Sequence, residues 1–452
     1  MTIGNTANLL SDFYDRLPEA VAEIVPDPEP CTQPGAFSPG FALPELDDAL
    51  AGFLAPATAA WHDIATYEGH RIVLLDLTGN PGTHTTKTFA SLLIVARAIE
   101  FIRRSGEPVV IFSPTSANKG TALRDAALGA YDAGLATPEE LRIVVLAPAG
   151  CRPKLRSSRL SQNPDLRALN PLLLYGGAQS EDVKTIGKEF VEKYAERLRS
   201  RTGAHLWFSL ELRNYLVADT ARAFFEHAVD PPSPDGPGRW HAHAVSSAFG
   251  LLGYHLGRQV LERSGEVSAA TRPASLLVQH LGTPDMVLSL RTGSFDRSGV
   301  PAYAPGDDGL LRQNDDPRFP ATTYASDEVL DPTFYTRRPA TSTSMNDIIG
   351  RFGGDGIVVS LHECLERYPF VRSCLATARR PLPPDPRELR EWSVVMALTG
   401  ALNAIDRGLI PAGDDVVVHG TGWYTSTDYE PPGPDEATPV MSVDDIAAAV
   451  VG

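Results

Sequence analysis

The chain has 452 residues, enough for about two or three domains, and its 40 Lys and Arg against 56 Asp and Glu give a formal net charge of −16. A chain this acidic lacks the basic surface that neutralises phosphates, so no nucleic-acid partner is expected. No apolar run approaches the ~20 residues that span a bilayer, so no membrane partner is expected either. Residues 1–25 lack the order of a signal peptide, and the four scattered cysteines contain no CxxC pair. We therefore expect a cytoplasmic protein without a thiolate zinc site.

Strands and helices alternate through the first third of the sequence. In chain order, the pattern predicts helices over 1–25 and 45–66, a strand over 71–77, a helix over 87–104, a strand over 109–112, a helix ending near 134 and a strand over 142–147. This alternation is typical of a parallel sheet whose strands are joined by helices, which places the chain in the α/β class.

The remaining two thirds are less regular. The pattern predicts helices over 183–199, 215–228 and 392–407, strands over 241–245 and 415–419, and an irregular insertion over 290–345 that is rich in Gly, Pro, Asp and Thr. We expect residues 1–88 to form N-terminal helices and the first part of a large domain, 89–200 a small domain, and 201–452 the remainder of the large domain.

Four segments of small or hydroxylated residues follow predicted strands. They span residues 78–87, 113–120, 246–250 and 420–422. Ligands of parallel α/β sheets bind beyond the carboxyl ends of the strands, where backbone N–H groups and helix N-termini face an anion. These segments are therefore the predicted ligand-binding positions.

The chain contains six lysines, at positions 87, 119, 154, 184, 188 and 193. Lys87 stands where a helix is predicted to begin, an unfavourable place for a surface cation because the helix N-terminus is itself positive. The same place, when buried, lowers the pKa of an amine and makes it a better nucleophile. Lys87 is accordingly the predicted reactive lysine.

The four segments resemble the pyridoxal-phosphate enzymes of fold type II, and most closely threonine synthase. The resemblance rests on four stretches in the family's order: His84-Thr85-Thr86-Lys87-Thr88-Phe89, Ser116-Ala117-Asn118-Lys119-Gly120, Val245-Ser246-Ser247-Ala248-Phe249-Gly250 and Gly420-Thr421. It implies an α/β fold like the β subunit of tryptophan synthase, with two domains that each hold a mostly parallel sheet flanked by helices.

The resemblance also implies a role for each matched residue. Lys87 would form a Schiff base with pyridoxal 5′-phosphate, Asn118 would face its phenolic oxygen, and Thr421 would meet its pyridine nitrogen. The cofactor phosphate would be held by Ser246, Ser247, Ala248, Phe249 and Gly250. On the substrate side, the resemblance and the neighbouring basic residues suggest His84, Thr85, Thr88, Ser116, Lys119 and Lys154.

Three positions depart from the family pattern. Thr88 stands in place of an aspartate, Lys119 in place of a threonine, and Ala248 in place of an asparagine. The first two changes affect the substrate side. The resemblance therefore implies an enzyme that eliminates or replaces a group at the β or γ carbon of an amino acid, with a substrate other than phosphohomoserine. The family habit further implies a homodimer.

Other interpretations stay open at this stage. The chain could be an authentic threonine synthase acting on O-phosphohomoserine, or a non-catalytic binding protein that keeps the fold. A third possibility is a nucleotide-binding P-loop over Gly79–Thr88, which ends in Lys-Thr but lacks the glycine directly before the lysine. No metal is expected, because His241, His243 and His255 have no evident third ligand among the nearby carboxylates.

Overall fold

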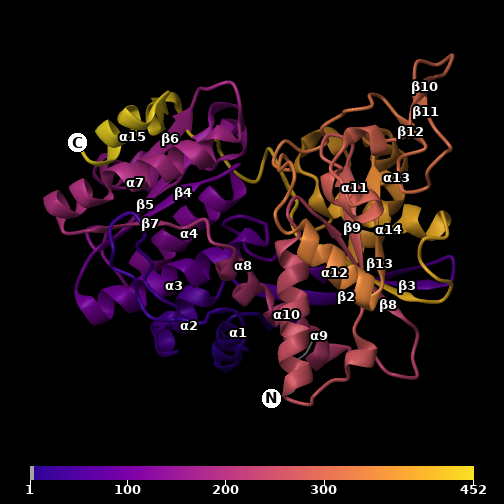
Figure 1. Cartoon of the computed structure of the whole chain (residues 1–452), viewed down its shortest axis with the longest axis horizontal. Helices are drawn as coiled ribbons and strands as arrows, with labels where there is room; N and C mark the ends of the chain where they lie inside the picture. The colour runs from indigo at the N-terminus through magenta and orange to yellow at the C-terminus, as the bar shows by residue number, and fades with distance from the viewer. Residues whose placement is uncertain (1–4) are drawn as a thin grey trace. The chain divides into compact units, whose positions relative to one another are not determined.

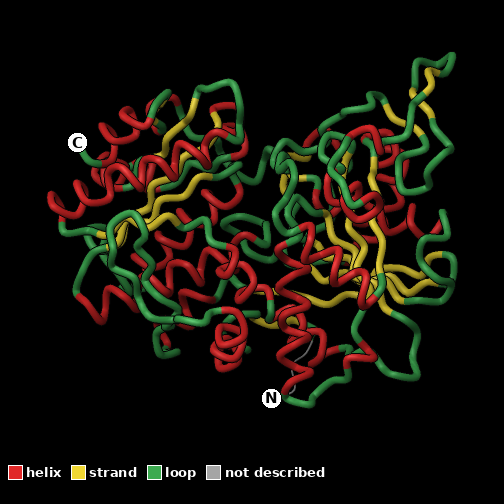
Figure 2. The backbone as a smooth tube through the Cα atoms, viewed as in Figure 1, coloured by secondary structure: helices red, strands yellow, loops and turns green. Residues whose placement is uncertain are grey.

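The computed structural model describes residues 5–452, in which strands alternate with helices over most of the chain (Figure 2). These residues form two units. Unit 1 contains residues 5–7, 58–79 and 219–426, and unit 2 contains residues 8–57, 80–218 and 427–452. Each unit has its own sheet and its own core, and each is described by itself below.

Unit 1 is built on a seven-stranded sheet with the order β1-β2-β3-β15-β8-β9-β13 (Figure 1). Its strands are β1 (Thr6–Asn8), β2 (Thr58–Tyr67), β3 (His70–Asp76), β8 (Arg239–Ala244), β9 (Ala274–His280), β13 (Gly354–Val359) and β15 (Asp415–Gly420). The five strands from β3 to β13 run parallel, and β2 pairs antiparallel with β3. The carboxyl ends of β3, β15 and β8 therefore lie next to one another at one edge.

Helices cover both faces of this sheet because its central strands are apolar on both sides. The helices of unit 1 are α9 (Ala221–Val229), α10 (Phe249–Arg263), α11 (Asp285–Thr292), α12 (Ser342–Phe352), α13 (Leu361–Cys374) and α14 (Ser393–Asp406). α13 and α14 pack with one set of alternating strand residues, which includes Leu74, Val278 and Val418. Val358, of the opposite parity, packs with α11. α14 is buried over most of its length, as expected for a helix that is apolar nearly all round.

Unit 2 is built on a five-stranded sheet with the order β17-β6-β5-β4-β7, in which every pair runs parallel. Its strands are β4 (Val109–Pro114), β5 (Leu141–Pro148), β6 (Leu172–Tyr175), β7 (His205–Phe208) and β17 (Thr438–Val440). Its helices are α1 (Leu17–Ile24), α2 (Asp48–Leu54), α3 (Lys87–Ser105), α4 (Asn118–Asp132), α5 (Arg159–Gln162), α6 (Pro164–Leu169), α7 (Asp182–Thr202) and α15 (Val443–Val450), with α8 (Leu212–Asp219) ending at its boundary. α7 and α15 pack on the sheet face that carries Phe112 and Val144, and α4 packs against Val145 on the other face.

The predicted α/β class is confirmed, and the helix over 87–104 begins at the expected residue. Two predicted helices are wrong. The stretch over 1–25 is helical only from Tyr14 onward, and its first four residues lie outside the described part of the chain. The stretch over 45–66 contains the short α2 and then β2, because residues 58–67 pair with β3 through a tight turn at Glu68 and Gly69. Both turn residues have positive φ, 47° and 82°, as such hairpins require.

The two units divide the chain differently from the expected domains. The expected small domain, residues 89–200, lies inside unit 2, which also includes 8–57 and the C-terminal 427–452. The expected insertion over 290–345 begins in the end of α11 and ends in the start of α12, and between them, over residues 293–341, the structure has one short turn of helix and three two-residue strands, β10 (Ala304–Pro305), β11 (Leu311–Arg312) and β12 (Thr322–Thr323). Across residues 5–452, no helix has both the length and the apolar composition needed to cross a membrane.

Candidate functional site

The residues singled out from the sequence fall into both units. Unit 2 contains His84, Thr85, Lys87, Thr88, Ser116, Asn118, Lys119 and Lys154. Unit 1 contains Ser246, Ser247, Ala248, Phe249, Gly250 and Thr421. Most of these residues stand at strand-to-helix connections, as the alternation of strands and helices predicts, whereas Thr421 lies between β15 and the short strand β16 (Tyr424–Thr425).

Lys87 is the first residue of α3. The first turn of this helix contains no acidic residue, and two arginines, Arg103 and Arg104, lie in its last turn, where the helix dipole favours them. His84, three residues before Lys87, has a φ of 54°. Lys87 Nζ lies over the ring of Tyr215, 5.4 Å from its centre. The local structure thus presents the amine of Lys87 at a helix N-terminus and against an aromatic face.

The loop before Lys87 is held by buried hydroxyl and amide groups. Thr83 Oγ1 donates to Asn80 Oδ1 at 2.6 Å and lies 2.7 Å from Thr88 Oγ1. The backbone N–H of Thr85 donates to Asn80 Oδ1 at 3.1 Å. All four residues are buried. Thr85 and Thr88, which the sequence suggested as substrate-binding, therefore take part in a network that fixes the shape of this loop.

The second segment connects β4 to α4. Ala117 precedes the helix with a φ of 124°, and Asn118 is its first residue. Thr115 Oγ1 accepts hydrogen bonds from the backbone N–H groups of Ala117 (3.1 Å) and Gly120 (3.0 Å), which fixes the turn. A Cβ on Gly120 would lie 2.8 Å from side-chain atoms of Thr115 and Val145, so only glycine fits there. The segment is a tight, pre-shaped turn at the N-terminus of a helix.

Lys119 is buried, and its ammonium donates to the carbonyl oxygen and hydroxyl of Ser209, at 3.0 and 3.2 Å. Its Nζ lies 5.7 Å from the centre of the same Tyr215 ring that faces Lys87. Burial, and next the charge of Lys87, lower the pKa of Lys119 to about 7. The structure thus brings Lys87 and Lys119 together. Lys154 is also buried, at the end of the turn that follows β5.

Replacing Ala117 by glycine should stabilise the protein. Its φ of 124° lies in a region that side chains disfavour at a cost of about 1–3 kcal/mol, whereas glycine adopts it freely. The gain is reduced by the entropy that glycine adds to the unfolded chain, which leaves about 1 kcal/mol. Thermal unfolding of Ala117→Gly would show this as a raised midpoint. Ala133→Gly is the matched control, because Ala133 has an ordinary helical φ of −81° and should lose stability.

The predicted phosphate segment of unit 1 connects β8 to α10. Ala248 precedes the helix with a φ of 52°. Gln279 donates to the carbonyl oxygen of Val245 at 3.3 Å, and Thr341 donates to that of Ser247 at 2.8 Å, so the loop is held from two sides. Thr421 directly follows β15, which is the neighbour of β8 in the sheet. Thr421 and the loop therefore stand at the same edge of the same sheet.

A buried guanidinium that the sequence analysis missed lies beside this loop. A Cβ on Gly250 would lie 2.5 Å from Arg222 Nη1 and 2.6 Å from His243 Nε2, so only glycine leaves room for both. Arg222 is fully buried and pairs with Asp219 at 2.6 Å. The signal was weak in the sequence because Arg222 is one of 34 arginines and stands 28 residues before Gly250.

Arg222 begins a chain of buried hydrogen bonds. It donates from Nη1 to His243 Nε2 (3.2 Å) and to His419 Nδ1 (3.0 Å). Because His419 Nδ1 accepts, its Nε2–H donates to His241 Nδ1 at 2.8 Å, and His241 Nε2–H then donates to Glu226 at 3.1 Å. Each histidine in this chain is therefore neutral. His241 and His243 thus share a strand face, and both rings form hydrogen bonds on each nitrogen.

Glu226 is the charged end of this chain. It is fully buried and pairs with Arg239 at 3.0 Å, and Tyr254 donates to it as well. Burial alone would raise the pKa of Glu226, but His241, Arg239 and the hydrogen bonds outweigh it and lower the pKa to about 2. Burial lowers the pKa of His241 and of His419, and lowers that of His255 to about 3. The unit therefore buries neutral histidines around one ionised carboxylate.

This arrangement predicts that the protein loses stability in mild acid. His255 titrates at about 3 when folded but at 6.5 when unfolded, so the unfolded chain binds more protons between these values. Stability should fall as the pH drops below 6.5, with a further loss from Glu226 between 4.5 and about 2. We expect a loss on the order of 3 kcal/mol by about pH 4, measured as the urea midpoint against pH. An unchanged midpoint across this range would contradict it.

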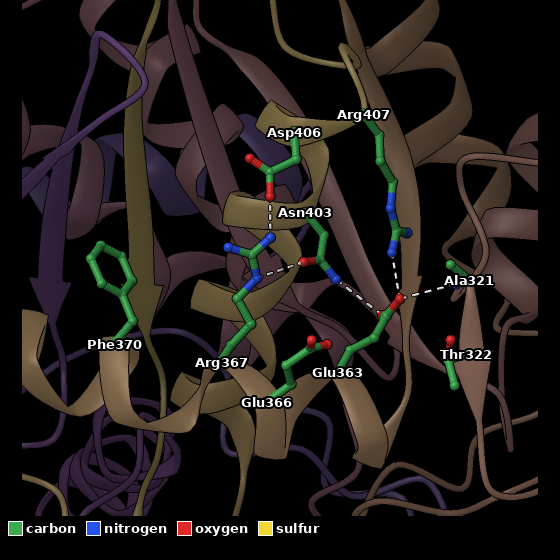
Figure 3. A pocket seen from close by; sticks show the side chains of 9 residues that line it. All are labelled: Ala321, Thr322, Glu363, Glu366, Arg367, Phe370, Asn403, Asp406 and Arg407. Atoms are coloured by element: carbon green, nitrogen blue, oxygen red, sulfur yellow. Dashed lines mark hydrogen bonds and ion pairs between the residues drawn. The ribbon is translucent and has the colours of Figure 1, made fainter. Parts of the chain in front are cut away.

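Unit 1 also has a polar pocket of about 480 Å³, which lies on α13, α14 and β12 (Figure 3). Glu363 accepts from the Asn403 side chain at 3.0 Å and from the Ala321 backbone at 3.1 Å, and it pairs with Arg407. Arg367 donates to Asn403 at 3.1 Å and pairs with Asp406. Two pairs of opposite charge thus lie within the pocket wall, and none of the residues predicted as functional from the sequence lines it.

The described residues fit pyridoxal phosphate at the positions that the sequence predicted. Five residues other than glycine have positive φ: Glu68, His84, Ala117, Ala248 and Arg338. Three of them, His84, Ala117 and Ala248, stand in three of the four predicted ligand-binding segments. Backbone strain of this kind is concentrated at ligand sites, where the surroundings impose it. Lys87 supplies an amine, and the loop over 246–250 combines a helix N-terminus with the neighbouring Arg222, which suits a phosphate.

The structure is similar to solved structures of threonine synthases. The pyridoxal-phosphate-bound enzyme from Brucella melitensis matches with a TM-score of 0.52 and 14% identity over 89% of this chain and 82% of that chain. The enzyme from Escherichia coli matches with a TM-score of 0.50 and 14% identity over 87% of this chain and 75% of that chain. At this identity the likeness concerns the fold alone, and it confirms the predicted fold type II architecture.

Comparison of sequences identifies a family but no curated protein. No curated protein matches the chain. A single family model spans nearly all of it, over residues 5–452, and its description is a family of unknown function. The chain therefore belongs to the family of unknown function DUF6002 and has the fold of the type II pyridoxal-phosphate enzymes.

Proposed function

We propose that this protein is a pyridoxal-phosphate-dependent enzyme that eliminates or replaces a group on an amino acid. The observation that carries the proposal is the coincidence of backbone strain with the predicted cofactor segments, at His84, Ala117 and Ala248. The fold supports it, because in doubly wound sheets such connections at the strand carboxyl ends hold ligands. A non-catalytic protein would have no need to keep the buried Lys119 beside Lys87 at one of these connections.

The proposal assigns a role to each predicted cofactor residue. Lys87 would hold the cofactor covalently, and Asn118, at the N-terminus of α4, would face it. The backbone N–H groups of the loop over 246–250 hold its phosphate, with Arg222 adding positive charge. Pyridoxal phosphate, when bound, supplies an electron sink for the α-carbon of an amino acid. The amine of Lys87, once released, takes the α-proton and can return it.

Thr421 offers a neutral hydroxyl where a carboxylate would hold a proton on the pyridine ring. A hydroxyl leaves that nitrogen largely unprotonated, which favours elimination and replacement over transamination. Authentic threonine synthase activity is the second candidate, and the fold likeness to threonine synthases is what favours it.

We also propose that the protein is a cytoplasmic homodimer.

The proposal is tested by adding pyridoxal phosphate to the purified full chain and recording its visible absorption. We expect a band that persists through gel filtration, and reduction with borohydride should fix the cofactor on the peptide that contains Lys87. Because the chain has six lysines, mapping the labelled peptide identifies which of them carries the cofactor. No retained band, or label on another lysine, would refute the proposal, and tight binding of ATP with magnesium would favour the P-loop alternative.

The substrate is tested separately with a panel of O-phosphorylated and O-acylated serine and homoserine. We expect turnover of a member other than phosphohomoserine, because Lys119 replaces a hydroxyl residue beside Lys87. Phosphate release from phosphohomoserine at about 1–10 s⁻¹, the rate of an ordinary enzyme, would instead identify a threonine synthase.

A further inference from the structure

The loop that precedes Lys87 is held by the side chain of Arg156, which lies between the turn that follows β5 and α5. Its guanidinium donates from Nη1 to the carbonyl oxygen of Gly82 at 2.8 Å and from Nη2 to that of Thr83 at 2.7 Å. Nη1 also donates to the carbonyl oxygen of Pro81 at 3.4 Å. A guanidinium presents its N–H groups in a rigid fork, so it binds neighbouring carbonyl oxygens only when they point the same way. Arg156 therefore selects one shape of this loop.

The peptide group that Arg156 binds stands directly before the strained residue of the loop. The carbonyl of Thr83 and the N–H of His84 belong to one peptide group, and this N–H donates to the backbone oxygen of Asn80 at 2.9 Å. Both sides of the peptide group are thus held, one by Arg156 and one by Asn80. His84 follows with a φ of 54°, which a residue with a side chain adopts only where its surroundings impose it. Arg156 is one of the groups that impose it.

Arg156 is in turn held by the C-terminal part of unit 2. Its guanidinium carbon lies 5.0 Å from the centre of the Tyr429 ring, and the Tyr429 hydroxyl donates to the carbonyl oxygen of Pro153 at 2.5 Å. The N–H of the next residue, Ser157, donates to the backbone oxygen of Glu430 at 2.8 Å. The C-terminal residues therefore fix both the side chain of Arg156 and the backbone around it.

The surroundings of Arg156 also favour a positive charge. Burial raises the pKa of the Asp125 carboxyl on α4, and the charge of Arg156 opposes this rise. The loop passes close to the same carboxylate, since a Cβ on Gly82 would lie 2.2 Å from Asp125 Oδ2. A cation suits this position, and the neighbouring carbonyl acceptors suit a forked guanidinium better than a single ammonium.

We propose that Arg156 is a positioning residue that, held by Tyr429, keeps the loop before Lys87 in the shape that presents the amine of Lys87 to the cofactor. This inference rests on the proposed role of Lys87 and deepens it. Arg156 acts through the backbone of the loop and touches neither the amine nor the substrate. Through this contact, the C-terminal part of unit 2 affects the reactivity of a lysine that lies far from it in the sequence.

Hydrogen exchange of the full chain without cofactor tests the contact directly, read from a peptide that covers residues 80–88. We expect Arg156→Met to speed the exchange of this peptide about tenfold, because the loop loses bonds from a charged donor and opens more often. Arg156→Lys should restore part of the protection, since it keeps the charge without the fork. Tyr429→Leu should speed exchange by a smaller factor. Arg159→Met is the matched control and should change nothing, because Arg159 pairs with Asp132 at the surface.

A second readout separates positioning from general stability. Arg156 is only half-buried, so Arg156→Met should unfold close to the urea midpoint of the wild type. Its affinity for pyridoxal phosphate, titrated by the visible band, should fall about tenfold, with Arg156→Lys between it and the wild type. Unchanged exchange over 80–88 in Arg156→Met would overturn the inference, as would faster exchange throughout unit 2 or equal effects in Arg159→Met. A wild-type chain that takes up no cofactor would refute the proposed function, whereas the exchange experiment decides the role of Arg156 in the loop.

Discussion

Lys87→Ala is expected to abolish the visible absorption band of the protein with pyridoxal phosphate and to lower its activity at least about 10²–10⁴-fold, as when a catalytic acid or base is removed. Lys87 is the first residue of α3 and lies against Tyr215, in the unit that also places the strained turns at His84 and Ala117. No other lysine begins a helix that follows a strand of the unit 1 sheet. The measurement is an absorption spectrum after gel filtration, with turnover of the best substrate from the panel.

Two controls make this result specific. Lys188→Ala removes an exposed lysine that pairs only with Glu192 on α7, and it should keep the band and the activity. Lys119→Met should keep the band, because Lys87 and not Lys119 is proposed to carry the cofactor. A retained band in Lys87→Ala, or a band lost in Lys188→Ala, would show that the cofactor is held elsewhere.

The second large effect is expected at Glu226, far from any predicted cofactor contact along the chain. Glu226→Ala should lower the free energy of unfolding by about 3 kcal/mol. The substitution removes the partner of Arg239 at 3.0 Å, of the His241 ring at 3.1 Å and of the Tyr254 hydroxyl, all in a fully buried setting. Arg239 keeps weaker contacts with Asp230 and Asp415, both at 3.3 Å, which holds the loss at the low end of the range for buried pairs.

Urea unfolding of Glu226→Ala and Glu226→Gln measures this effect and separates its parts. Glutamine keeps an acceptor for His241 but removes the charge that balances Arg239, so it should lose less than alanine and should weaken the acid-induced loss below pH 4.5. Asp308→Ala, which removes an exposed pair with Arg312 in the same unit, is the control for a carboxylate at the surface and should cost little. An equally small loss at Glu226 would contradict the role assigned to the buried network.

Local sequence was sufficient to predict an element where the types of neighbouring residues and their spacing indicate the same structure. The helix from Lys87 was predicted correctly because its apolar residues recur at helical spacing and Gly106 ends it with a φ of 70°. The tight turn before Asn118 was likewise evident from its position after an apolar strand. The predicted helix over 45–66 failed because residues 58–67 gain their strand from pairing with β3, and the energy of that pairing is not visible in either stretch alone.

By itself the sequence determined the α/β class, the order of the strand-to-helix connections and the lysine at the start of α3, since each depends on residues close together in the chain. Only the tertiary structure decided what surrounds those residues. The bond between Arg222 and His419 joins positions 197 residues apart, and that between Lys119 and Ser209 joins positions 90 apart. Whether a buried lysine meets a carboxylate, a hydroxyl or a second lysine depends on packing between distant elements, and its charge and reactivity follow from that packing rather than from the residue type.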